Sequence, residues 1–73
     1  MIDVHIYDSY TDDNCIKTKI PIIPKIGEEI GLYINGDWYV FEVTYVLPML
    51  NRDNTFNAYW ITLEGNFEEI KRM

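Results

Sequence analysis

The segment Ile30-Gly31-Leu32-Tyr33-Ile34-Asn35-Gly36-Asp37-Trp38-Tyr39-Val40-Phe41-Glu42-Val43 decides the fold. Apolar side chains recur at every second position before Asn35-Gly36, and β-branched and aromatic residues follow it, which is typical of two β-strands. Asn and Gly tolerate the positive φ angles that a type I′ turn requires, so the segment predicts a β-hairpin. Its second strand, expected over residues 37–47 with Pro48 ending it, is longer than an ordinary strand and therefore predicts a sharp bend.

The two-residue alternation also divides the hairpin and the last predicted strand into an inner and an outer face. The residues expected in the interior are Ile30, Leu32, Ile34, Tyr39, Phe41, Val43, Ile61 and Leu63. This assignment leaves Trp38 and Trp60 on the opposite face. Their rings are then either exposed, as aromatic residues at protein interfaces are, or packed over the ends of the fold or against the segment from Phe67.

Three other segments show the same period of two. Strands are expected over residues 2–7, over residues 15–22 with Pro21 near an edge or a bulge, and over residues 56–63. Polar residues at 8–14 and 51–54 indicate loops. After Gly65-Asn66, residues 67–73 are compatible with a terminal strand or a short helical turn.

This order of elements predicts an all-β fold in one domain spanning residues 1–73. We expect a small antiparallel five-stranded barrel of the Src homology 3-like type, because closure of the sheet removes its exposed edges. No linker, repeat or low-complexity segment indicates a second domain. A chain of 73 residues with a single cysteine, Cys15, depends on packing or association for its stability, so we also expect a homo-oligomer.

The stretch Ile23-Pro24-Lys25-Ile26-Gly27-Glu28-Glu29-Ile30, followed by Asn35-Gly36-Asp37-Trp38-Tyr39-Val40-Phe41-Glu42-Val43, resembles small uncharacterised β-barrel proteins of bacteria and their phages. Those proteins share a Pro-x-Ile/Val-Gly-Glu-x-Ile/Val turn, a hairpin and an aromatic strand. The resemblance implies the barrel fold. The abundance of Ile, Asn, Lys and Tyr fits an AT-rich genome, and with it a phage or mobile element.

The formal charge of −6 excludes several classes of function. Affinity for nucleic acid comes mainly from Lys and Arg, so we expect no nucleic-acid partner. No apolar stretch approaches the ~20 residues of a membrane helix, and residues 1–6 do not begin a signal peptide, so we expect no membrane association and a cytoplasmic location. A basic protein partner, or none, suits this charge better.

The sequence predicts no catalytic, cofactor or metal site. His5 is the only histidine and lacks ligands at a recognised spacing. Cys15 beside His5 would lack an orienting third group. The acidic loop that contains Asp8, Asp12 and Asp13 lacks the central glycine and the terminal glutamate of a calcium loop.

Two sets of charged residues are candidates for binding. The predicted protein interface combines aromatic and acidic residues: Trp38, Trp60, Asp8, Asp12, Asp13, Glu28 and Glu29. Lys17 and Lys19 alternate along one strand face and form a candidate contact for an anionic group. The remaining basic residues are dispersed.

Two functions follow from these features. The first is a non-enzymatic binding protein, encoded by a phage or mobile element, whose acidic and aromatic surface meets a host protein or copies of the chain itself. It would inhibit a host protein by occluding it. The alternative is an oligomeric protein that sequesters a nucleotide, with Trp and Tyr stacking on the base and Lys17 or Lys19 contacting phosphate. An enzyme is not expected.

Overall fold

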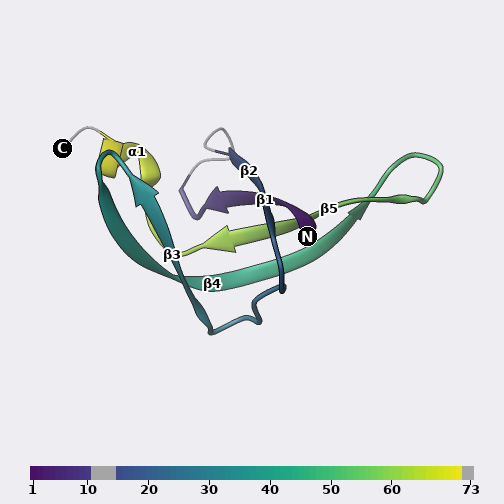
Figure 1. The fold of residues 1–73 in the computed structure, drawn as a ribbon, viewed down its shortest axis with the longest axis horizontal. Helices are drawn as coiled ribbons and strands as arrows, with labels where there is room; N and C mark the ends of the chain where they lie inside the picture. The colour runs from purple at the N-terminus through teal and green to yellow at the C-terminus, as the bar shows by residue number, and fades with distance from the viewer. Residues whose placement is uncertain (11–14, 72–73) are drawn as a thin grey trace.

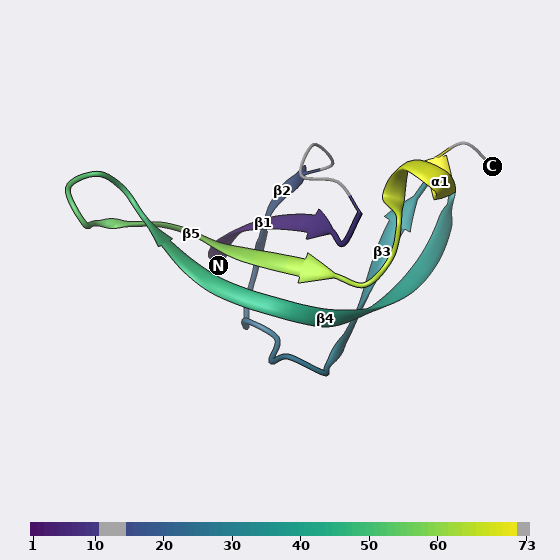
Figure 2. The same cartoon turned by 180° about the vertical axis from the view of Figure 1, so that it is seen from behind.

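A computed structural model describes residues 1–10 and 15–71 of the chain. The elements in this part are β1 (Ile2–Asp8), β2 (Cys15–Ile20), β3 (Glu29–Ile34), β4 (Asp37–Leu50), β5 (Phe56–Leu63) and α1 (Phe67–Lys71). The strands form one sheet in the order β2-β1-β5-β4-β3. The sheet curls into a half-barrel, with α1 beside the end of the β3–β4 hairpin (Figure 1, Figure 2).

The prediction of a purely antiparallel barrel is wrong, because β1 and β5 pair in parallel and the sheet is mixed. Short turns fix the antiparallel β3–β4 and β4–β5 pairs, whereas no local turn sets the direction in which the two distant strands β1 and β5 meet. The strand order also leaves β2 and β3 at opposite ends of the sheet. The mostly β, barrel-like architecture is confirmed, whereas the Src homology 3-like type stays a prediction.

The β3–β4 hairpin forms as its sequence predicts. Asn35 and Gly36 have φ angles of 53° and 85°, both positive as a type I′ turn requires. The register places Tyr33 opposite Trp38. This turn therefore fixes which residues of the two strands share a face.

Strand β4 is the long bent strand that the sequence predicts, and it pairs with β3 up to Glu42 and with β5 from Val43 onward. A register shift between Val43 and Tyr45 marks the bend. The prediction that Pro48 ends this strand is wrong, since β4 continues to Leu50. Only β5 flanks this end of β4, and an edge position tolerates a proline.

The inner face of the curled sheet holds the hydrophobic core. Its buried members are Val4, Ile6, Ile34, Phe41, Val43, Ile61, Leu63 and Phe67. Every residue that the sequence assigns to the interior belongs to this cluster or packs against it. The expected division into an inner and an outer face is confirmed.

The second strand is shorter than predicted. β2 ends at Ile20, and Ile22 lies after Pro21 with 78% of its surface exposed. Pro21 cannot donate to a strand ladder, which accounts for the early end.

The segment after Gly65-Asn66 is the short helix α1 rather than a strand. The side chain of Asn66 accepts a hydrogen bond from the Glu69 amide at 3.1 Å, as a helix N-cap does. Asp8 Oδ2 accepts a hydrogen bond from the Phe67 amide at 2.9 Å. The Phe67 ring packs edge to face on Phe41 with centroids 5.3 Å apart, so α1 closes one end of the core.

Candidate functional site

The outer face of the β3–β4 hairpin carries an exposed apolar cluster. Trp38 and Tyr33 are cross-strand partners, and Val40 follows Trp38 on the same face. Their exposed fractions are 69%, 62% and 66%. The indole and phenol rings pack edge to face with centroids 5.2 Å apart. We call Tyr33, Trp38 and Val40 the β3–β4 patch.

Exposed apolar side chains recur on the outer face of β4 beyond Glu42, which separates them from the patch. Tyr45 and Leu47 are both partly exposed and pair with the outward residues Thr62 and Trp60 of β5. The β4–β5 hairpin then projects away from the body of the fold (Figure 1) and exposes Leu50. Because β4 passes through both halves of the sheet, one strand carries apolar side chains along a large part of the outer surface.

Trp60 lies on the outer face, as predicted, but its surroundings differ from those of Trp38. It is half-buried and stacks on Tyr7 of the neighbouring strand, with ring centroids 3.9 Å apart and an interplanar angle of 17°. Its Nε1 donates a hydrogen bond to Thr62 Oγ1 at 2.8 Å. Trp60 is therefore held by its own chain, whereas Trp38 presents most of its surface to solvent.

Two carboxylates face each other beside the patch. Glu29 and Glu42 are directly opposite in the register of β3 and β4, both are exposed, and both share the outer face with Val40. Like charges in such a pair destabilise a sheet. Among residues 1–10 and 15–71, no Lys or Arg forms an ion pair with either carboxylate. The pair adds negative charge next to exposed aromatic surface.

The other acidic candidates occupy different places. Asp8 is 3% exposed and holds the start of α1, so it does not belong to an exposed surface. Glu28 is exposed in the turn before β3, where its Oε1 accepts a hydrogen bond from the Lys25 amide at 2.6 Å. Asp12 and Asp13 lie outside the described residues. The structure therefore places Trp38 and Glu29 on the same outer face of the β3–β4 hairpin, whereas Asp8 is buried in β1.

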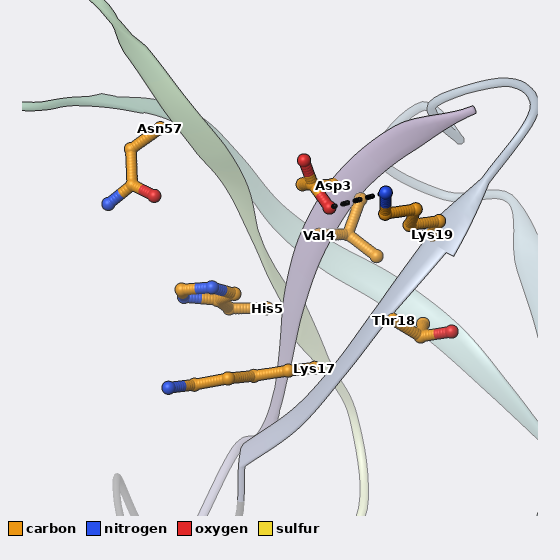
Figure 3. A pocket seen from close by; sticks show the side chains of 7 residues that line it. All are labelled: Asp3, Val4, His5, Lys17, Thr18, Lys19 and Asn57. Atoms are coloured by element: carbon orange, nitrogen blue, oxygen red, sulfur yellow. Dashed lines mark ion pairs between the residues drawn. The ribbon is translucent and has the colours of Figure 1, made fainter.

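Lys17 and Lys19 project from β2 and line a pocket of about 340 Å³ (Figure 3). Asp3 and His5 of β1 and Asn57 of β5 also line it. The sequence alternation places the two lysines on one face, but it does not indicate that His5 and Asn57 join them. Asn57 is brought close by the long-range pairing of β1 with β5, which leaves no local signal in the sequence.

Cys15 and His5 do not form a nucleophile and base pair. Cys15 is opposite Tyr7, and His5 is opposite Lys17. Within residues 1–10 and 15–71, no group of three or more His, Cys, Asp or Glu side chains is arranged to hold a metal ion. In that same part of the chain, no helix is long and apolar enough to span a membrane.

Asp53 lies in the β4–β5 turn, and hydrogen bonds within that turn perturb its pKa. Asp53 accepts hydrogen bonds from the Thr55 hydroxyl at 2.6 Å and from the Thr55 amide at 3.1 Å. Both hydrogen bonds lower the pKa of Asp53 below its ordinary value of 3.8, and the bond from the hydroxyl has the larger effect. Asp53 is exposed, and its two contacts with Thr55 fix the shape of the hairpin tip.

The chain matches no known protein-family model, and no curated protein or solved structure is significantly similar to it. The physical class of the molecule is a small curled-sheet β protein with an apolar and acidic outer surface.

Proposed function

We propose that the protein is a non-enzymatic binding protein that occludes a basic surface of another protein with its β3–β4 patch. The observation that carries this proposal is the exposed cross-strand pair of Tyr33 and Trp38 beside Val40. Tryptophan and tyrosine supply much of the binding energy at protein interfaces, because each buries a large apolar area with few rotatable bonds.

The rigidity of the patch supports its use in binding. Tyr33 and Trp38 are adjacent to the type I′ turn and belong to paired strands. Their rings already contact each other at 5.2 Å between centroids. Binding therefore costs little side-chain or backbone ordering, which favours affinity.

The charge beside the patch favours a basic partner. A Lys or Arg placed between Glu29 and Glu42 would relieve the repulsion of two carboxylates that face each other across β3 and β4. The net charge of −6 would also speed association with a positively charged surface. Two copies of this chain repel each other at the same place, so a basic protein suits the patch better than a second copy does.

Trp38→Ala is expected to weaken partner binding by about 30-fold or more, the effect of truncating an interface hot spot of about 2 kcal/mol. The stability of the fold should change little, because Trp38 is 69% exposed in the free protein. The measurement is affinity capture from a lysate of the cells that encode the protein, with each captured protein identified, purified and titrated against both variants.

Lys25→Ala serves as the matched control, since Lys25 is exposed and lies outside the patch. Captured proteins should bind wild type and Lys25→Ala equally and should be released by salt, as attraction between opposite charges requires. Measurement of the solution mass of each variant separates self-association from partner binding. Equal capture by wild type and Trp38→Ala would contradict the proposal.

A further inference from the structure

The pocket at the β1–β2 end of the sheet gathers hydrogen-bond donors from three strands. His5 comes from β1, Lys17 and Lys19 come from β2, and Asn57 comes from β5. Figure 3 shows His5 and Lys17 side by side, with their polar ends directed to the same side of the sheet as Asn57. Their positions follow from the register, in which His5 is opposite Lys17. We infer that this pocket binds a small organic phosphate.

The local charge of the pocket is opposite to that of the whole molecule. Lys17 and Lys19 contribute two positive charges and Asp3 one negative charge, in a chain whose net charge is −6. The two ammonium groups match the charge of a phosphate monoester, and the Asn57 amide and the His5 imidazole supply further donors. The pocket therefore differs in charge from the surface beside the β3–β4 patch, where Glu29 and Glu42 lie.

Asp3 competes with an anion for Lys19. The Lys19 Nζ and Asp3 Oδ1 atoms are 3.9 Å apart, and the two side chains are 64% and 55% exposed. An exposed ion pair at this distance is weak, so Lys19 can turn from Asp3 to a phosphate group at little cost. Removal of the negative charge of Asp3 is therefore expected to change the affinity of the pocket for an anion.

The size of the pocket favours an organic phosphate over the bare ion. Its volume of about 340 Å³ lies at the lower end of the range of small-molecule sites, ~300–1,000 Å³, and exceeds what one tetrahedral anion fills. Trp60 is opposite His5 in the register and shares the outer face, stacked on Tyr7. A planar group joined to the phosphate would have this aromatic pair as its neighbour.

The test is a titration of the ¹⁵N-labelled protein with adenosine monophosphate, inorganic phosphate and adenosine, followed by NMR. The monophosphate should saturate shifts at His5, Lys17, Lys19 and Asn57. Inorganic phosphate should bind the same residues more weakly, and adenosine should bind least. Equal affinity for adenosine monophosphate and inorganic phosphate would show that the pocket binds an anion, but it would contradict the inference that the ligand is an organic phosphate.

Three variants test the geometry. Lys17→Gln is expected to weaken monophosphate binding about tenfold through the loss of one charge-assisted contact. Asp3→Asn is expected to strengthen it about threefold by freeing Lys19. Lys25→Gln, an exposed lysine outside the pocket, should leave it unchanged. The inference is overturned if no saturable shift occurs, if Lys25→Gln has the same effect as Lys17→Gln, or if adenosine binds as well as its monophosphate.

Discussion

Replacing Gly65 by alanine is expected to destabilise the fold by about 3 kcal/mol, a large part of the stability of a small domain. Gly65 joins β5 to α1 with a φ angle of 155°, which residues with a side chain rarely adopt. A Cβ atom added there would lie 2.8 Å from Cδ1 and Cε1 of the buried Phe41 ring. The ring cannot move away freely, because it packs on Phe67 in the core.

Gly27→Ala is the matched control for this change. Gly27 also has a positive φ angle, 94°, but no atom lies within 4 Å of the added Cβ position. Only the backbone cost, about 1 kcal/mol, should appear. Urea unfolding of both variants measures the difference. Equal losses of stability in the two variants would show that the contact of the added Cβ with Phe41 does not destabilise the fold.

Replacing Asp8 by alanine is expected to cost about 2 to 3 kcal/mol and to loosen α1 first. Asp8 is 3% exposed, and its carboxylate accepts the hydrogen bond from the Phe67 amide. Removal of the carboxylate leaves that buried amide without this acceptor, which costs more than an ordinary hydrogen bond contributes. The measurement is amide hydrogen exchange at residues 67–71 together with the free energy of unfolding.

Asp8→Asn retains a side-chain oxygen at nearly the same place and should recover part of the loss. A stability of Asp8→Ala equal to that of the wild type would contradict the role of Asp8 in holding α1. So would unchanged hydrogen exchange at Phe67. This role also explains why the first strand ends in a carboxylate directed into the core rather than in the acidic surface that the sequence suggests.

The strands could be predicted because their signals are local. The Asn35-Gly36 turn fixes the β3–β4 register, and alternation then assigns Phe41 to the core and Trp38 to the outer face. The parallel pairing of β1 with β5 has no such signal, since the two strands are separated by most of the chain. The open half-barrel and the mixed sheet follow from that pairing, so they could not be derived from alternation alone.

The candidate surfaces could likewise be predicted only where their signals are local in the sequence. The outward positions of Trp38 and Trp60 follow from alternation, but the Tyr7 stack that holds Trp60 depends on the pairing of β1 with β5. Lys17 and Lys19 share a face by their spacing, whereas Asn57 reaches their pocket through tertiary structure. Asp8 appears in the sequence as one more loop carboxylate, and only the position of α1 reveals its partner.

The most direct test of the β3–β4 patch is the fluorescence of Trp38 alone. In a Trp60→Phe variant, Trp38 is the single tryptophan, and its 69% exposure predicts red-shifted emission that iodide quenches readily. On addition of the purified partner, the proposal predicts a blue shift and protection from iodide, because the indole becomes buried at the interface. Emission and quenching that stay unchanged in a saturated complex would contradict it.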